Sequence, residues 1–347
     1  MEPLAYVLSE YPVPSQTFVH AEISALRDAG IPVEVVAHVA HPPIAFGTHE
    51  GARSVPVAHV GLDKAETAGV LRRYRHLHAH FGDFGVRVLG PLAARADRPW
   101  SVTCHAYDIF RRDAAVRPEE WRGLGPHCRK VVAISRFHAR YLADRGLDPD
   151  RIAVIPNAAR LVDLLADAPP PPVHLRKVLA VGRPVAKKGF PVLIQAWAKA
   201  RGVIADLELE IIGGEGLVTE PPAGLTLSPM CPYGQVLRTM AASDLVVAPS
   251  VVGPDGDMDG IPTVLVEALA LRRPVVASAV TGIGDLVCDG VDGLLVPPGD
   301  ADALAAALIR LASRPAELQR LGAGGPMLAA AHDARRVAER LQTEVFA

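Results

Sequence analysis

Two carboxylates, Asp259 and Glu267, have the clearest chemical spacing in this sequence, with seven residues between them. Gly260 and Pro262 predict a helix that begins near Thr263, because proline is favoured in a first helical turn. Asp259 then lies in the preceding loop, and Glu267 lies about one turn inside the helix. The free N–H groups and positive end of such a helix suit a phosphate. A carboxylate within the helix can hold two vicinal hydroxyls, as on a ribose, and the loop carboxylate could hold a sugar.

A basic loop follows the first strand expected in the second half of the chain. It contains Gly182 and Arg183, followed by Lys187, Lys188 and Gly189 ahead of an expected helix. A glycine for close approach, together with arginine and lysine, is suited to neutralising a diphosphate. Only six of the 36 basic residues are lysines, so two adjacent ones favour a specific requirement for compact charge. A solvated surface turn is the alternative. The loop is neither a P-loop nor a G-x-G-x-x-G motif.

Histidines lie in or after two expected strands of the first half. His76, His78 and His80 alternate, so they share one face of a strand. A metal site is conceivable there, but no carboxylate or cysteine is spaced in the sequence to complete it, which favours polar lining of a cleft. His105 follows the next strand, where it can position a hydroxyl or stabilise a developing charge. A half-exposed loop histidine is the alternative.

A polar loop, Ser15-Gln16-Thr17, opens the first expected helix. Serine and threonine are natural N-caps, which is the structural interpretation. The functional interpretation is that the loop and the start of the helix face an anion or a polar substrate.

Strand-like and helix-like segments alternate along the chain, which predicts parallel sheets covered by helices on both faces. The expected strands are residues 4–8, 33–39, 76–81, 100–104, 131–134, 152–155, 178–181, 207–212, 245–248, 275–277 and 293–296. Four consecutive prolines at 169–172 fit neither a helix interior nor a central strand, so they indicate a stiff linker. We therefore expect two doubly wound α/β domains, over residues 1–165 and 166–329. Ligands should bind at the carboxyl ends of their strands.

The composition excludes several classes of protein. With 50% hydrophobic and 21% charged residues, the chain is neither disordered nor a disulfide-rich mini-protein. A net charge of −2 provides no field for nucleic acid or anionic lipid. Neither a transmembrane segment nor a signal peptide is expected, which places the protein in the cytoplasm, as a monomer or homodimer. A local patch of Arg72, Arg73 and Arg75 is the one candidate for peripheral membrane contact.

These motifs resemble those of the family 4 retaining glycosyltransferases of the GT-B fold. The family signature is E-G-x-P-x-V-L-x-E-A-x-A, and residues 259–270 read D-G-I-P-T-V-L-V-E-A-L-A. Residues 11–18, with Y-P-x-x-S-Q-T-F, are similar to the opening of the colanic-acid and exopolysaccharide branch. I-P-N at 155–157, V-G-R at 181–183 with K-G at 188–189, and G-x-x-G-L-L-V-P-P-G-D at 290–300 also match. The likeness therefore extends over most of the chain.

The resemblance implies two Rossmann-like domains that face each other across a cleft, with a final helix over 330–347 that crosses back to the first domain. It implies transfer of a hexosyl group from a nucleotide diphosphate sugar, with UDP or GDP as the nucleotide, and retention of anomeric configuration. The implied acceptor is a glycan or a small soluble metabolite, and neither a cofactor nor a metal is required.

The resemblance also assigns roles by position. The residues implied to bind the donor diphosphate are Arg183, Lys188, Ile261, Pro262 and Thr263, and those implied to bind the donor sugar are Asp259, Gly260 and Ile261. Glu267 is implied to bind the ribose, Met230 and Cys231 to bind the base, and His105 and Asp259 to act near the reacting carbon. The residues implied to bind the acceptor or line the cleft are Ser15, Gln16, Thr17, His80 and Asp108.

Two departures from the family pattern stand out. Asp259 replaces the first glutamate of the pair and is shorter by one methylene, which could alter the sugar accepted. Arg272 replaces the glycine that ends the helix, so we expect the left-handed cap to be lost or reworked. Neither change removes a phosphate ligand, so we expect an active enzyme. A catalytically silent nucleotide-sugar-binding protein is the alternative. A dinucleotide oxidoreductase is disfavoured because the glycine fingerprint is absent.

Overall fold

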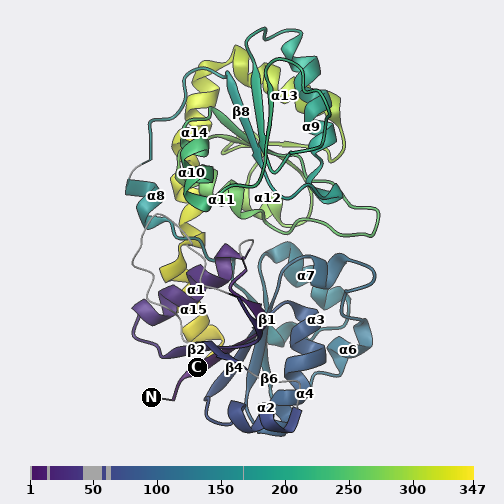
Figure 1. The fold of residues 1–347 in the computed structure, drawn as a ribbon, viewed down its shortest axis with the longest axis vertical. Coiled ribbons are helices and arrows are strands. Elements are labelled where there is room, and N and C mark those ends of the chain that lie inside the picture. Colours follow the sequence, from purple (N-terminus) through teal and green to yellow (C-terminus); the bar gives the residue numbers. More distant parts are fainter. Residues whose placement is uncertain (1, 14–15, 42–56, 60–63, 167) are drawn as a thin grey trace. The chain divides into compact units, whose positions relative to one another are not determined.

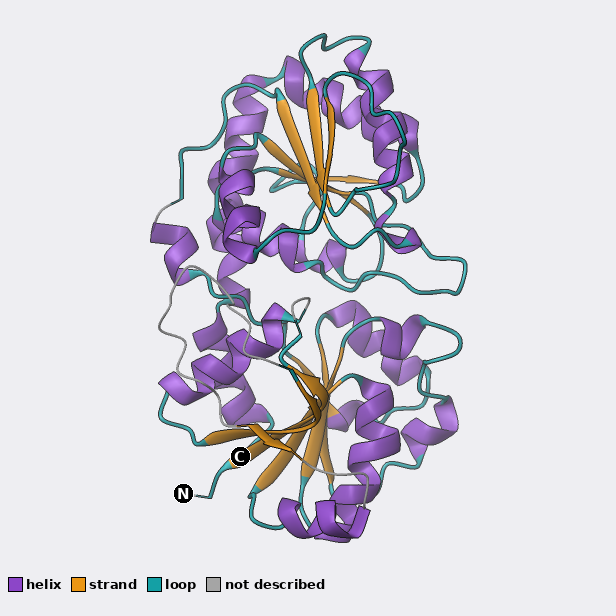
Figure 2. Ribbon diagram, in the orientation of Figure 1, coloured by secondary structure: helices purple, strands orange, loops and turns teal. Residues whose placement is uncertain are grey.

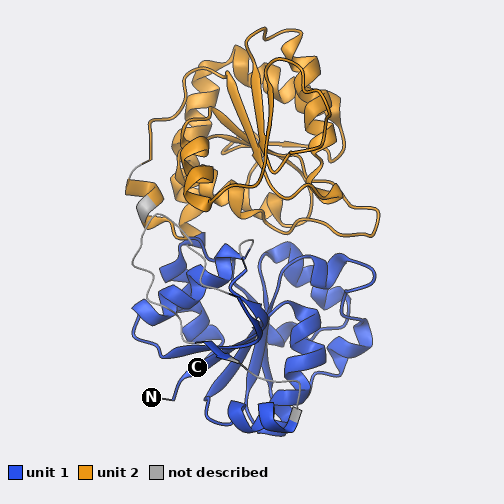
Figure 3. Cartoon of the chain, viewed as in Figure 1, with its two compact units in different colours: residues 1–159, 332–347 blue, residues 160–331 orange. Residues whose placement is uncertain are grey.

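The computed structural model describes residues 2–13, 16–41, 57–59, 64–166 and 168–347. The chain forms two compact units, and each has its own parallel sheet with helices on both faces (Figure 1; Figure 2). Unit 1 contains residues 1–159 and 332–347, and unit 2 contains residues 160–331 (Figure 3). The expected fold class, two doubly wound Rossmann-like domains, is confirmed.

Unit 1 is built on a seven-stranded sheet in the order β3-β2-β1-β4-β5-β6-β7, with every pair parallel. Its strands are β1 (Leu4–Tyr11), β2 (Val33–Ala40), β3 (Val57–His59), β4 (His76–His80), β5 (Trp100–Cys104), β6 (Cys128–Ala133) and β7 (Ile152–Val154). The central strands β4 and β5 are buried along their whole length, as expected for a parallel sheet covered on both faces.

The helices of unit 1 connect these strands and include one from the end of the chain. They are α1 (Thr17–Asp28), α2 (Lys64–Leu71), α3 (Gly82–Phe84), α4 (Gly90–Ala96), α5 (Tyr107–Phe110), α6 (Pro118–Arg122), α7 (Arg136–Asp144) and α15 (Ala334–Glu344). Helix α15 packs against α1 and contributes Val337 and Leu341 to the core of unit 1, where Phe346 is also buried.

Unit 2 is built on a six-stranded parallel sheet in the order β10-β9-β8-β11-β12-β13. Its strands are β8 (Lys177–Val181), β9 (Glu208–Ile212), β10 (Leu225–Ser228), β11 (Leu245–Ala248), β12 (Val275–Ser278) and β13 (Leu294–Val296). Its helices are α8 (Val162–Ala166), α9 (Phe190–Arg201), α10 (Tyr233–Ala241), α11 (Thr263–Ala270), α12 (Ile283–Leu286), α13 (Ala301–Ser313) and α14 (Pro315–Ala329).

Both sheets reverse their winding direction at one point. The strand order turns back between β1 and β4 in unit 1 and between β8 and β11 in unit 2. At such a switch point the loops that follow the two neighbouring strands diverge to opposite faces, which leaves room for a ligand at their carboxyl ends. The loop after β8 carries the basic residues singled out in the sequence, the loop after β11 carries Asp259, and helix α11, which follows that loop, carries Glu267.

The end of helix α11 corrects one expectation from the sequence. Arg272 keeps the left-handed conformation of the glycine that it replaces, with φ of +56°, so the turn is retained rather than lost. The next residue, Arg273, is buried and donates hydrogen bonds to the carbonyl oxygens of Ser243, Pro169 and Pro170. Arg273 therefore ties the proline segment to the residues that precede the inner strands β11 and β12.

No helix within the described ranges combines the length and the apolar character that crossing a membrane would need.

Candidate active site

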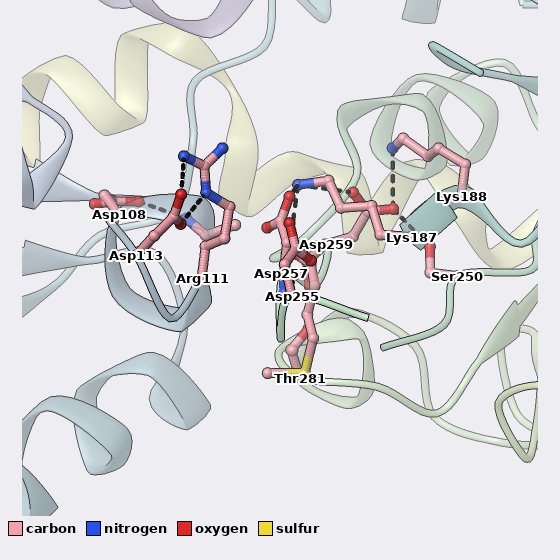
Figure 4. A network of polar contacts seen from close by, with 12 residues as sticks. Asp108, Arg111, Asp113, Lys187, Lys188, Ser250, Asp255, Asp257, Asp259 and Thr281 are labelled. Atoms are coloured by element: carbon pink, nitrogen blue, oxygen red, sulfur yellow. Dashed lines mark hydrogen bonds and ion pairs between the residues drawn. The ribbon is translucent and has the colours of Figure 1, made fainter. Parts of the chain in front are cut away.

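The loops after β8 and β11 meet at a buried carboxylate in unit 2. Lys188 Nζ donates a hydrogen bond to Asp259 Oδ2 at 2.9 Å, and the Ser250 hydroxyl donates to the same oxygen at 2.6 Å. Only 6% of Asp259 is exposed. Figure 4 shows both donors directed at this carboxylate. Lys188 and Asp259, which are 71 residues apart, were each assigned to donor binding from the sequence, and the fold brings them together.

The ionisation of Asp259 is set by two opposing effects. Burial raises its pKa, whereas the Lys188 and Lys187 ammonium groups and the Ser250 hydroxyl lower it. The lowering effects win, so the pKa lies below its usual value and the side chain is a carboxylate at neutral pH. A fixed negative charge beside a lysine can accept hydrogen bonds from sugar hydroxyls.

Close backbone approach makes this arrangement possible. Gly189 has φ of +62°, and a Cβ there would lie 1.9 Å from the carbonyl oxygen of Pro249. The amide of Val251 also donates to the carbonyl oxygen of Lys187 at 2.8 Å. Any side chain at position 189 would therefore separate the two loops, which is the physical reason for the glycine after the lysine pair.

The segment between Asp259 and helix α11 is held by a residue that sequence reasoning missed. The Thr281 hydroxyl donates to the carbonyl oxygens of both Asp259 and Gly260. Ile261 and Pro262 are buried, and Thr263 begins the helix without an acidic residue in its first turn. No described side chain caps this helix start, and no acidic side chain of the first turn lies near its free N–H groups. These groups can therefore bind an anion.

Arg183 and the candidate base-binding residues are more accessible. Arg183 is exposed in the loop after β8, and its guanidinium group pairs with no side chain among the described residues. Met230 is exposed, and its sulfur would lie 2.8 Å from a Cβ built on Gly213. Cys231 is half-buried beside it. Met230 therefore lies against the Gly213 turn at the end of β9, next to the loop after β8.

Glu267 is buried within helix α11, as expected from the sequence. Burial raises its pKa to about 7, and a hydrogen bond from the Tyr233 hydroxyl, at 3.1 Å, opposes this effect. Tyr233 lies on α10 and carried no recognisable signal in the sequence.

In unit 1, His105 lies at the carboxyl end of β5 and pairs with His80. His105 Nε2 and His80 Nδ1 are 2.9 Å apart, and both rings are almost fully buried. Burial, followed by the neighbouring His80 and His138, lowers the pKa of His105 well below its usual value, so the ring is neutral. A neutral imidazole can donate one hydrogen bond and accept one.

Asp108 supports the turn that carries His105. It is fully buried, and its carboxylate accepts hydrogen bonds from the backbone N–H groups of Gly82, His105 and Ala106. Burial raises its pKa to about 6, against these hydrogen bonds. Because its oxygens are taken by the backbone, Asp108 acts within this unit as an anchor between the ends of β4 and β5.

Helix α1 supplies a carboxylate that sequence spacing did not reveal. Glu22 Oε1 lies 3.3 Å from His80 Nε2 and 3.8 Å from His78 Nε2, and it accepts a hydrogen bond from Tyr6. Among the described residues, the three ligand atoms of Glu22, His78 and His80 lie within 4.8 Å of one another, a set that could hold a metal ion. His78 already bonds Ser101 and Thr103, so these groups form a buried polar network around His80.

The remaining sequence-predicted positions lie at the start of α1. Ser15 is outside the described residues. Gln16 immediately precedes the helix and makes no side-chain capping bond, and Thr17 is its half-buried first residue.

The chain has two doubly wound units, and the second has a lysine–carboxylate pair and a helix start at its switch point. This combination defines a protein of the GT-B class. Two family descriptions match the chain: "Glycosyltransferase Family 4" over residues 15–163 and "Glycosyl transferases group 1" over residues 176–314.

Individual relatives agree with these matches. The chain is 28% identical to the putative colanic acid biosynthesis glycosyltransferase WcaL of Salmonella typhimurium, over 88% of this chain and 89% of that protein. It is 31% identical to a phosphatidyl-myo-inositol mannosyltransferase of Mycolicibacterium smegmatis, over 82% and 77% respectively. Among solved structures, Anabaena HepE in complex with UDP has the same fold, with a TM-score of 0.79, 17% identity and 98% of each chain covered.

The chain therefore belongs to glycosyltransferase family 4. It is an enzyme of nucleotide-sugar-dependent glycosyl transfer and is related to those of exopolysaccharide synthesis.

Proposed function

We propose that this enzyme transfers a hexosyl group from a UDP- or GDP-sugar to a glycan acceptor of exopolysaccharide type, with retention of anomeric configuration and without a metal or other cofactor. The observation that carries the proposal is the pair formed by half-buried Lys188 and buried Asp259, in the loop that leads directly into helix α11. This arrangement offers positive charge for a diphosphate and a carboxylate for the attached sugar.

The donor-site roles follow from charge and hydrogen-bonding capacity. Lys188, the exposed Arg183 and the N–H groups at Ile261–Thr263 would bind the diphosphate. Their positive charge would stabilise the nucleoside diphosphate as it leaves, and this is the charge that a metal ion supplies in other enzymes. When the donor binds, Lys188 would turn part of its hydrogen bonding from Asp259 to phosphate.

The remaining contacts would orient the donor. Asp259 and Gly260 would hold the hexose, Glu267 the two ribose hydroxyls, and Met230 with Cys231 the base. His105 would act near the reacting carbon, where its neutral ring can accept or donate a hydrogen bond.

The relatives support the choice of donor and acceptor. HepE was solved with UDP and with UDP-glucose, and a GDP-mannose-dependent mannosyltransferase of Mycolicibacterium smegmatis is 28% identical to this chain. The likeness to the colanic acid enzyme, which spans most of both chains, supports a glycan acceptor. The family likeness supports retention.

A thermal-shift panel of UDP-, GDP-, ADP- and dTDP-sugars would identify the donor, because a ligand that binds only the folded state raises the melting temperature with concentration. Absence of a shift with any UDP- or GDP-sugar would contradict the proposed donor site. With a donor in hand, activity should persist in EDTA, and NMR of the product should show the donor's anomeric configuration.

Replacement of the phosphate-binding lysine tests the central role. Lys188→Met should lower kcat/KM by about 100-fold or more, because one charged donor to the leaving group is lost. Lys199→Met is the matched control, since Lys199 pairs with Asp302 on the surface of the same unit, and it should leave kcat/KM unchanged. Equal activity of the two variants would refute the role of Lys188.

A further inference from the structure

Lys187 is a second lysine in the loop after β8, and the proposed diphosphate contacts leave it unused. Its side chain is only 10% exposed, and its Nζ lies 2.8 Å from Asp257 Oδ2. It also donates to the carbonyl oxygen of Met258 at 3.5 Å. Lys188 is also paired with a carboxylate, but its side chain is more exposed, at 19%, and its partner is Asp259 rather than Asp257.

The two lysines hold opposite ends of one short segment. Lys187 pairs with Asp257 and lies 4.0 Å from Asp259 Oδ1, whereas Lys188 bonds Asp259 Oδ2. Figure 4 shows both ammonium groups directed at the segment from Asp257 to Asp259. The backbone hydrogen bond from the Val251 amide to the Lys187 carbonyl oxygen also holds the loop after β8 against the loop after β11.

Removal of either member of a buried ion pair leaves an uncompensated charge, which is strongly unfavourable. Loss of Lys187 or of Asp257 should therefore release the segment from Asp257 to Asp259. The position of Asp259 would then be less well defined. The pair therefore restrains the backbone on the N-terminal side of Asp259, while Lys188 and Ser250 hold the carboxylate itself.

We propose that Lys187 is a positioning residue that clamps the Asp257–Asp259 segment, through Asp257, so that Asp259 is held for the donor hexose. Lys188 is then the phosphate-binding lysine of the pair. This inference rests on the proposed donor site and assigns the two adjacent lysines to different tasks.

The test compares binding of a nucleotide with binding of the same nucleotide carrying a sugar. The probes are UDP and UDP-glucose, or GDP and GDP-mannose if these give the larger thermal shift, measured by calorimetry. In Lys187→Met, affinity for the bare nucleotide should stay within about twofold, while the sugar nucleotide should bind about tenfold more weakly. Lys188→Met should weaken both. Equal loss of bare-nucleotide affinity in the two variants would overturn the proposal.

Asp257→Asn supplies the second arm. A clamp predicts that Asp257→Asn reproduces Lys187→Met and that the double variant is no worse than either, because both changes break one interaction. A Lys187 that bound phosphate would instead be freed by Asp257→Asn, so tighter binding of the bare nucleotide would refute the clamp. Lys187→Arg should restore binding of the sugar nucleotide, and Lys199→Met should change nothing.

A readout without ligand separates failure of the clamp from failure of the donor site. Hydrogen exchange of amides in residues 251–262 should accelerate in Lys187→Met and Asp257→Asn but not in Lys199→Met. Unchanged exchange would reject the clamp even if nucleotides bind. Accelerated exchange in a protein that binds neither nucleotide would support the clamp and reject the proposed donor site.

Discussion

At the level of a single residue, Glu267 and Asp259 show how the surroundings of a buried carboxylate set its ionisation. It is buried to about the same extent as Asp259, yet the two groups have opposite pKa changes. Asp259 has two ammonium groups beside it. Among the described residues, the neutral Tyr233 hydroxyl is the one group that lowers the pKa of Glu267, so burial dominates that pKa. Glu267 therefore changes charge near neutral pH, and Asp259 does not.

Glu267 should make folding stability depend on pH. Its folded pKa of about 7 lies above the ordinary 4.5, so the folded state keeps a proton that the unfolded state releases. Its contribution is complete below about pH 4.5 and is lost as the pH rises to about 7, a change of about 3 kcal/mol. Urea unfolding of the wild type and Glu267→Gln at pH 5 and pH 8 would measure it. The variant should gain stability relative to the wild type at the higher pH, and parallel pH profiles would contradict this account.

At the level of elements, the local sequence pattern was enough to place the main strands and the site loops. Every expected strand overlaps a strand of the structure, because buried parallel strands form short apolar runs between helices. Strands β3 and β10 were missed because their sequences, V-A-H and L-T-L-S, contain no apolar run of three residues. The equally short edge strands β7 and β13 were predicted because I-A-V and L-L-V are unbroken apolar runs.

The partners of the site residues could not be read in the same way. Thr281, Tyr233 and Glu22 come from elements distant in sequence from the groups that they contact. Ser250 lies in the same loop as its partner Asp259, but neither it nor the other three belongs to a motif with a fixed spacing to its partner. The fold alone brings them together. The Lys187–Asp257 pair is a further example, because the sequence suggested only that two lysines face a phosphate.

The turn after helix α11 permits a test of backbone strain. Arg272 is exposed and adopts φ of +56°, a conformation that costs a residue with a Cβ about 1–2 kcal/mol. Glycine removes this strain, but it also gives the unfolded chain more conformational freedom, which lowers the free energy of unfolding by about 0.5–1 kcal/mol. Arg272→Gly should therefore raise the free energy of unfolding by about 0.5 kcal/mol in urea titrations. Arg272→Ala keeps the strain and should show no gain. An equal gain in both variants would exclude strain as its source.

At the level of the whole molecule, the two units differ in how the chain builds them. Unit 2 is one continuous segment, residues 160–331, with its own sheet and hydrophobic core. Unit 1 is discontinuous, because α15 and Phe346 return from the end of the chain to complete its core. All the groups proposed for the diphosphate, ribose and base lie in the continuous unit.

The fragment 160–331 should therefore fold alone and bind the bare nucleotide with an affinity within about tenfold of the full chain, since a domain with its own core can fold independently. The complementary fragment 1–159 should fold only when residues 332–347 are fused to it or added, because without them Val337, Leu341 and Phe346 are missing from its core. Circular dichroism and calorimetry with UDP and GDP would measure both outcomes. A folded fragment 160–331 that binds neither nucleotide, alongside a full chain that does, would show that unit 1 supplies an essential part of the nucleotide site. A stable fragment 1–159 would contradict the role given to the returning helix.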